Sequence, residues 1–261
     1  MTEVVAVSSF LIRVLGPLDV FTSDGPKHAG GHHQKKLLAA LVLGANHAVT
    51  IDHLAEILWG EEAPPSRDNT LQSYVYRLRH LIGPDAILSK DHSYELVVEP
   101  DQLDALRFER LVNQAESIRD DPDRSGLLWR EALSMWRGDP FGEFGDEDPF
   151  RLESLRLVEL RLLAMERRLE CDIAMDRHEM VVGALEGLVE ENPYNEKLWY
   201  LLIEALAGSG RRVDSLRAFD RLLEVLAEVG LEPSPALKDL EELVITGGDI
   251  HSNRGSAGQR G

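Results

Sequence analysis

The fold of this chain is decided by Ser66–Ile82, which reads SRDNTLQSYVYRLRHLI. Pro64-Pro65 precedes this stretch and Gly83-Pro84 follows it, so the sequence predicts a single helix with two defined ends. Ser66 belongs to the residue types that cap helix N-termini, and we expect its side chain to cap this one.

The two sides of the predicted helix differ in composition. One narrow side collects apolar residues at helical spacing: Leu71, Val75, Leu78 and Ile82. The opposite side, called the outer face below, consists of Asn69, Thr70, Ser73, Tyr76, Arg77 and His80. It contains no acidic residue, although the chain has 46 Asp plus Glu against 28 Lys plus Arg, and it holds side chains that contact base edges and phosphates. The pattern indicates a DNA recognition helix; an ordinary amphipathic surface helix is the alternative that it leaves open.

Length and composition favour two domains. With 261 residues, of which 43% are hydrophobic, the chain can bury two cores. No run of about 18 apolar residues occurs, and an acidic residue stands where a signal peptide has basic ones, so we expect a cytoplasmic protein with no membrane partner. The single cysteine, Cys171, excludes an intrachain disulfide and a cysteine-rich zinc site, and its apolar neighbours predict a buried position.

The net charge of −18 argues against a nucleic-acid partner until the chain is divided. Residues 1–100 hold 8 Lys plus Arg and 12 Asp plus Glu, a net charge of −4, which leaves −14 for the remainder. Seven of the nine histidines also lie in the first 100 residues, where partial protonation near a polyanion reduces negative charge. We therefore expect DNA binding to reside in residues 1–100.

The elements around the recognition helix predict a winged helix-turn-helix. Apolar runs at 11–15 and 18–21, separated by Gly16-Pro17, predict a small antiparallel sheet, and 23–26 is expected to be a turn. Helices are expected from Gln34 to Leu43 and from a cap at Thr50 to Gly60. Residues 87–89 and 94–98 then predict a terminal hairpin, the wing.

The rest of the chain has a helical pattern. Asp104 is expected to cap a helix with an apolar side, and a long helix is expected over about 150–174. A shift of 34 residues then aligns similar residues, including Leu169 with Ile203 and Leu188 with Leu222, which is the tetratricopeptide period. Two small residues are expected where helices approach closely, Ala184 and Ala218.

These stretches resemble the Streptomyces antibiotic regulatory protein family, whose N-terminal domain is similar to the winged helices of OmpR-type response regulators. The resemblance rests on Leu15-Gly16-Pro17-Leu18, on Leu58-Trp59-Gly60 with the following acidic-Pro-Pro loop, on 69–75 with Arg77-Leu78-Arg79, and on Tyr94-Glu95-Leu96. The stretch of about 102–245, including 230–237, resembles the family's bacterial transcriptional activation domain. The wing departs from the family pattern because it lacks a Pro-Pro-Gly turn. Asp91 would face phosphate unfavourably if it pointed at the duplex, which leaves Lys90 and His92 as the usable donors of the wing.

The predicted fold class is mainly α with a small β part: a winged helix-turn-helix domain over 1–100, an all-α tetratricopeptide-like helical repeat domain over 101–246, and a disordered tail over 247–261. No phosphate-binding loop occurs, the histidines at 28–33 lack a spaced carboxylate, and the acidic run at 146–148 is expected to be solvated. We therefore expect no cofactor, no metal and no enzymatic activity.

The sequence thus predicts a transcriptional activator. Its DNA contacts are expected from the outer face, from the flanking Arg67 and Arg79 as phosphate contacts, and from Lys90, while Glu61 and Glu62 are expected to contact RNA polymerase. The resemblance implies direct-repeat sites at promoters of secondary-metabolite genes and contacts to RNA polymerase holoenzyme through its sigma factor; a homodimer on DNA stays open. The alternative is a helical-repeat scaffold whose winged helix binds protein.

Overall fold

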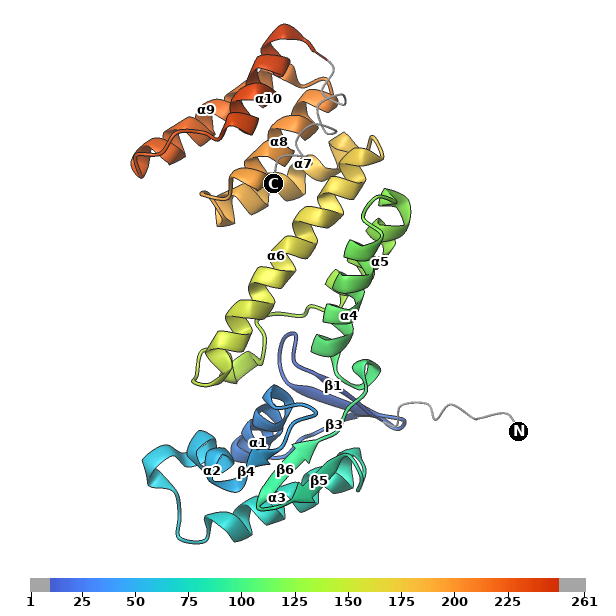
Figure 1. The fold of residues 1–261 in the computed structure, drawn as a ribbon, viewed down its shortest axis with the longest axis vertical. Coiled ribbons are helices and arrows are strands. Elements are labelled where there is room, and N and C mark those ends of the chain that lie inside the picture. The colour runs from blue at the N-terminus through green and yellow to red at the C-terminus, as the bar shows by residue number, and fades with distance from the viewer. Residues whose placement is uncertain (1–9, 249–261) are drawn as a thin grey trace, which may run out of the picture. The chain divides into compact units, whose positions relative to one another are not determined.

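The computed structural model describes residues 10–248, and Figure 1 shows their helices and strands. The chain divides into two compact units. The first combines the chain up to Ser117 with Arg130–Ala164, and the second combines Ile118–Trp129 with the chain from Met165 onward. Helices dominate both units, and the strands of the described residues lie in the first. The expected fold class, mainly α with a small β part, is confirmed.

The first unit opens with a three-stranded antiparallel sheet in the order β1-β2-β3. Its strands are β1 Phe10–Arg13, β2 Asp19–Thr22 and β3 Gly25–Lys27. Ile12 pairs with Val20, and both side chains are buried. The first two strands fall where the apolar runs predicted them, whereas β3 occupies a segment that was expected to be only a turn.

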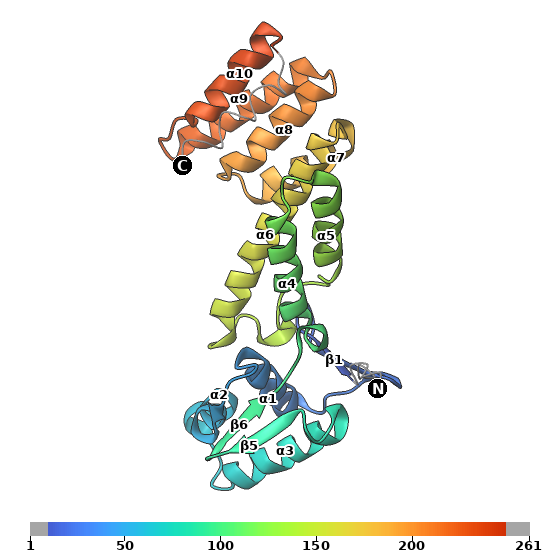
Figure 2. The same cartoon turned by 45° about the vertical axis from the view of Figure 1, so that its right-hand side comes forward.

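A winged helix follows this sheet. Its helices are α1 His32–Leu43, α2 Ile51–Trp59 and α3 Arg67–Ile82. A second sheet has the order β4-β6-β5, with β4 Val49–Thr50, β5 Ile87–Lys90 and β6 Ser93–Leu96. The three helices contact one another, α1 also contacts β6, and α3 lies beside the hairpin of β5 and β6 in Figures 1 and 2. Of the three helices only α1 starts earlier than predicted, by two residues, and β6 starts one residue earlier than predicted.

The starts of α2 and α3 test two predicted caps. The Thr50 side chain accepts a hydrogen bond from the His53 backbone N–H at 3.2 Å, as expected. Ser66 occupies the N-cap position of α3, but its side chain makes no capping hydrogen bond, so that expectation was wrong. Its carbonyl instead accepts from the Thr70 backbone N–H and hydroxyl, both at 3.0 Å. α3 therefore begins directly after Pro64-Pro65 without a side-chain cap.

The first unit is completed by helices that come after the wing. These are α4 Asp104–Ser117, α5 Pro122–Ser134 and α6 Phe150–Ala174, with the short 3₁₀ helices η1 Gly60–Glu62, η2 Pro100–Gln102 and η3 Gly142–Phe144 elsewhere in the unit. α6 has the predicted bounds. The division between the units falls inside α5 and α6, at Arg130 and Ala164, so each of these helices contributes to both.

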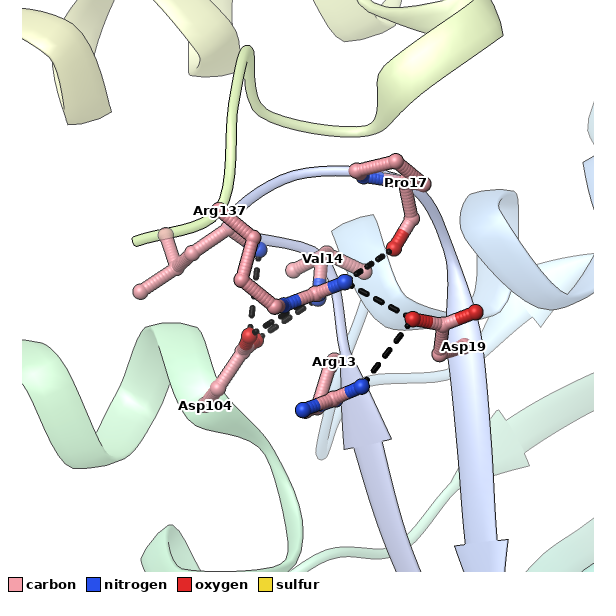
Figure 3. Close-up of polar contacts among 7 residues, drawn as sticks. Arg13, Val14, Pro17, Asp19, Asp104 and Arg137 are labelled. Carbon is pink, nitrogen blue, oxygen red and sulfur yellow. Dashed lines mark hydrogen bonds and ion pairs between the residues drawn. The ribbon is translucent and has the colours of Figure 1, made fainter. Parts of the chain in front are cut away.

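A buried polar joint ties α4 to the first sheet (Figure 3). The Asp104 carboxylate accepts hydrogen bonds from the Val14 backbone N–H at 2.7 Å and from the Leu15 backbone N–H at 3.1 Å. Asp104 is 3% exposed, and burial raises the pKa of its carboxyl against the opposing effect of these bonds. Asp104 was expected to cap α4 with its side chain. In the structure the carboxylate accepts from the Ala105 backbone N–H at the start of α4 and also bonds the loop after β1.

Arg137 forms the other half of this joint. Its Nη1 donates to the Asp19 carboxylate at 2.7 Å and to the Pro17 carbonyl at 3.0 Å, while its Nη2 lies 3.7 Å from Asp104. Gly16 has φ +140, and a Cβ there would lie 2.9 Å from the Arg137 Cβ, so only glycine fits this approach. Figure 3 shows Arg137 between the two carboxylates. The loop between β1 and β2 is therefore held from outside the predicted 1–100 domain.

The segment between α5 and α6 packs against the same unit. Phe141 and Phe144 are buried beside Phe150, with ring centroids 5.5 and 6.0 Å away. Lys36 of α1 donates to the Glu147 carboxylate at 2.6 Å. The acidic run at 146–148 was expected to be solvated; Asp146 and Asp148 are exposed, and the Glu147 side chain stays 41% exposed although it also pairs with Lys36.

The second unit contains the helical repeats. Its helices after α6 are α7 His178–Glu191, α8 Glu196–Gly208, α9 Arg212–Glu228 and α10 Pro235–Thr246. α6 and α8 end 34 residues apart, and α7 and α9 begin 34 residues apart. The 34-residue sequence period therefore corresponds to a repeat of helix boundaries, and α7, α8 and α9 pack in sequence order.

The buried positions of the repeat agree with the sequence alignment except at one residue. Leu169 and Ile203 are buried, as are Leu188 and Leu222. Ala218 is buried, but Ala184 is exposed, so the expected close approach holds only in α9. Cys171 is buried, as predicted. Of the predicted tail, 249–261 lies outside the described residues, while Gly247 ends α10 in the left-handed conformation.

Candidate nucleic-acid interface

The apolar side of α3 fixes which residues face outward. Leu71, Val75, Leu78 and Ile82 are between 0% and 3% exposed, and α3 packs against α1 and α2. A helix buried along one narrow side must present the opposite side away from the core. The predicted division of α3 into a packed side and an outer face is therefore present in the structure.

The outer face is a continuous polar surface. Asn69, Ser73, Tyr76, Arg77 and His80 are exposed, and Thr70 is half-buried because its hydroxyl donates to the Ser66 carbonyl. Gln72 is also exposed at the margin of this face. The sequence analysis omitted Gln72, although its spacing of three from Asn69 and four from Tyr76 could have identified it.

Two aromatic rings, those of Tyr76 and His80, form a contacting pair on the outer face. The centroids of the Tyr76 and His80 rings lie 5.0 Å apart with an interplanar angle of 39°, as expected for side chains four apart on a helix. Tyr76 remains 64% exposed. The pair offers an apolar surface with polar edges, which suits contact with sugars, thymine methyl groups and base edges.

Arg67 and Arg77, two of the predicted DNA contacts, differ in whether their guanidinium groups form ion pairs within the protein. Arg67 is paired with Asp52 at 2.5 Å and lies 3.5 Å from Asp68. Arg77 is exposed, and within residues 10–248 no protein group forms an ion pair or hydrogen bond with its guanidinium. Since a free cation loses no internal bond on binding phosphate, Arg77 is the better placed of the two for a polyanion.

Arg79 is turned toward the wing. Its Nε and Nη2 donate to the Ile87 carbonyl at 2.8 and 2.6 Å, and Nη2 also donates to the Ser89 hydroxyl at 2.8 Å. Tyr94, on β6, is buried, which raises the pKa of its hydroxyl, and the Arg79 charge opposes this rise. Arg79 therefore has acceptors inside the protein that Arg77 lacks.

The wing is a tight hairpin. Lys90 pairs with Ser93, and the two residues between them, Asp91 and His92, have φ of 42° and 59°. A two-residue loop with both φ values positive matches the twist of the strands, and Asp and His tolerate this conformation better than most residues. In place of a Pro-Pro-Gly turn, the wing therefore turns through Asp91 and His92, both with positive φ. Lys90 is exposed at the tip, beside the acidic Asp91.

Glu61 and Glu62 lie on a separate surface between α2 and α3. Both are exposed in η1, and Gly60, with φ +55, allows the chain to turn there. They are not part of the outer face. In this position the two carboxylates are accessible to a basic partner.

Residues 10–248 offer neither a metal-binding cluster nor a membrane-spanning helix. This part of the chain contains no group of three or more His, Cys, Asp or Glu side chains placed to hold a metal ion. Among the helices of the same residues, none has the length and apolar composition needed to cross a membrane.

Two family models match the chain in the order that the fold suggests. Residues 28–93 match the model described as "Transcriptional regulatory protein, C terminal", and residues 103–245, more than half of the chain, match "Bacterial transcriptional activator domain". The first match covers the winged helix and the second the helices from α4 to α10. Winged helix and activator domain together define a bacterial transcriptional regulator.

Curated relatives make the class more specific. The chain is 31% identical to the regulatory protein DnrI of Streptomyces peucetius, covering 90% of this chain and 91% of DnrI. It is 31% identical to AfsR of Streptomyces griseus and 32% identical to EmbR of Mycobacterium tuberculosis, over 89% of this chain, but it spans only 24% and 62% of those proteins. The chain belongs to the Streptomyces antibiotic regulatory protein family. The family models and these relatives carry names of transcriptional regulators and not of enzymes.

A solved structure shows the same fold. Mycobacterium tuberculosis EmbR, in complex with a low-affinity phosphopeptide, superposes with a TM-score of 0.85 at 29% identity. The similarity covers 93% of this chain and 66% of EmbR. The winged helix followed by helical repeats is therefore an arrangement that this chain shares with EmbR.

Proposed function

We propose that this chain is a sequence-specific transcriptional activator that binds double-stranded DNA through the outer face of α3. The observation that carries the proposal is the state of this face: all its residues but the half-buried Thr70 are exposed, it contains no carboxylate, and among residues 10–248 its Arg77 guanidinium has no partner. The N-terminal location of the winged helix, away from the more acidic remainder of the sequence, supports the same assignment.

The outer face has the chemistry for both parts of DNA recognition. The amide, hydroxyl and imidazole groups of Asn69, Ser73 and His80 can exchange hydrogen bonds with base edges, while Arg77 can reach a guanine or a phosphate. Arg67 and Lys90 lie outside this face and are assigned to phosphate contacts. For Arg67 such a contact must compete with its ion pair to Asp52.

Activation is assigned to Glu61 and Glu62. Their exposure on η1 supports a contact with a basic surface of the sigma factor in RNA polymerase holoenzyme. The family membership supports direct-repeat sites near promoters of secondary-metabolite genes, and two repeats would bring two copies of the chain together on DNA. Native mass spectrometry of the complex with one and with two repeats tests this stoichiometry.

DNA binding is tested by a mobility shift at several salt concentrations. Fragments from promoters adjoining the gene should be bound more tightly than unrelated DNA of equal length, and Arg77→Ala should weaken this binding. Arg124→Ala is the matched control, because Arg124 is exposed on α5 at 74% of its side chain, in the second unit. Binding without any sequence preference would favour a scaffold whose winged helix binds protein.

Activation is tested by transcription with purified polymerase. Glu61→Lys combined with Glu62→Lys should lower transcription while DNA affinity stays equal or rises slightly, because two positive charges are added near a polyanion. Asp24→Lys, in the exposed turn of the first sheet, is the control for added positive charge. Parallel loss of DNA binding and transcription would mean that the double variant is misfolded or that these residues act in DNA binding.

A further inference from the structure

Arg79 connects the recognition helix to the wing. All three of its hydrogen bonds, at 2.6 to 2.8 Å, go to acceptors on β5, namely the Ile87 carbonyl and the Ser89 hydroxyl. The side chain is half-buried. Its guanidinium therefore links two elements that are separated by the turn at 83–86 and that, under the proposed function, both face DNA.

The Ile87 carbonyl is available because of the register of the wing. β5 is an edge strand in the order β4-β6-β5, and the Val97 N–H donates to the Ala86 carbonyl at 2.9 Å. In an antiparallel pair, residues alternate between hydrogen-bonded and non-hydrogen-bonded positions. Ile87, opposite Leu96, falls at a non-hydrogen-bonded position, so its carbonyl points away from β6 and toward α3.

The shape of the arginine side chain matters for this contact. An edge carbonyl without a strand partner must be satisfied by another donor. The planar guanidinium presents several N–H groups in a fixed fork, so it can bond Ile87 and Ser89 together, whereas a lysine ammonium acts as a single point charge on a flexible stem. A single contact with a phosphate can be made through charge alone, and lysine supplies that charge.

We propose that Arg79 is a positioning residue that locks the wing hairpin onto α3, so that the outer face and Lys90 approach DNA as one rigid surface. This inference rests on the proposed function for its consequence, although the lock itself is a property of the free protein. It replaces a direct phosphate contact as the role of Arg79. The lock also accounts for how the wing is held in place. β5 is an edge strand with no strand on its outer side, and Arg79 attaches that side to α3.

Hydrogen exchange in the free full chain tests the lock without DNA. In Arg79→Ala and in Arg79→Lys, amides of β5 and β6 should exchange at least about tenfold faster than in the unmodified protein. Arg77→Ala, two residues away and without a partner on the wing, should leave their exchange unchanged. Unchanged exchange in both Arg79 variants would overturn the proposal. If either variant is unfolded, Ser89→Ala removes one acceptor only and should still accelerate exchange in β5.

DNA affinity then separates positioning from direct contact. A positioning role predicts that Arg79→Lys weakens binding as much as Arg79→Ala, by about tenfold, because the charge is kept but the fork is lost. A phosphate contact predicts that Arg79→Lys binds almost like the unmodified protein, and that result would overturn the proposal. If the unmodified protein binds no DNA, the proposed function fails, while the exchange measurement still decides whether Arg79 is the lock.

Discussion

The first unit contains two charged clusters that are used in opposite ways. Around Asp104 and Arg137 the charges are buried or half-buried, paired with one another, and bonded to backbone groups of the loop after β1. On the outer face of α3 the only cation, Arg77, is exposed and has no partner among residues 10–248. Both clusters contain an arginine, but of the two only Arg137 is paired with carboxylates of the described residues.

This difference indicates what each cluster contributes. A buried charge network fixes the geometry of the groups that it bonds, and breaking it leaves uncompensated groups in a medium of low polarity. An exposed and unpaired cation contributes little to folding but remains available to an external anion. We therefore expect the Asp104 cluster to govern stability and the outer face to govern binding, and each expectation can be tested by itself.

The largest expected effect comes from cutting the chain at the predicted domain boundary. A fragment of residues 1–100 lacks Asp104 and Arg137, so the β1–β2 loop loses its partners, and the apolar surface beneath α4 becomes exposed. We expect this fragment to be less stable than residues 1–164 by about 5 kcal/mol, which approaches the whole stability of a small domain. Thermal melts followed by circular dichroism compare them. Equal melting temperatures would show that the joint does not stabilise the winged helix.

A single substitution examines the same joint more directly. Asp104→Ala removes both acceptors of the Val14 and Leu15 N–H groups and leaves Arg137 with one carboxylate fewer. We expect a loss of about 3–5 kcal/mol of unfolding free energy, measured by urea denaturation. Asp101→Ala is the control, since Asp101 pairs with Arg110 at the surface and such pairs contribute little. Similar losses for the two variants would contradict the distinction between buried and exposed charges.

Local signals explain which parts of this molecule could be predicted from sequence. Pro64-Pro65 and Gly83 are adjacent to the ends that they set, and the apolar spacing within α3 decides its buried side. The contact of Asp104 with Val14 joins residues 90 positions apart, and nothing in one sequence encodes such a pairing. Arg79 illustrates the same limit, because its position on α3 was predictable but its preference for the edge of β5 depends on the register of the wing.

Substitution of Arg77 on the outer face should have a smaller effect than the two changes above, and it should change DNA affinity and not stability. Arg77→Ala should weaken operator affinity by about 1–3 kcal/mol if Arg77 contacts a base, or reduce the salt slope by about 1 if it contacts a phosphate. Its melting temperature should stay unchanged, since the side chain has no internal partner. Leu78→Ala, at the next position on the buried side, should show the reverse through a cavity costing about 2–5 kcal/mol. Full affinity of a folded Arg77→Ala variant would exclude this arginine from the interface.

The smallest expected effect is a difference in pKa between two carboxyls close in sequence: that of Asp104 is raised and that of Asp101 is lowered. Burial raises the pKa of Asp104 above its ordinary value of 3.8, whereas a hydrogen bond from Arg110 lowers the pKa of Asp101 below the same value. The stabilising contribution of Asp101 is therefore present above pH 3.8 and lost as the pH falls through its lowered pKa. The pH-dependent part of the Asp104 contribution has the other sign: it favours folding below pH 3.8 and is lost as the pH rises through its raised pKa. Carbon-13 NMR of the two carboxyls across this range measures both values. A pKa of Asp104 at or below that of Asp101 would mean that the hydrogen bonds from the β1–β2 loop and the charge of Arg137 outweigh burial, so that the joint favours the ionised carboxylate.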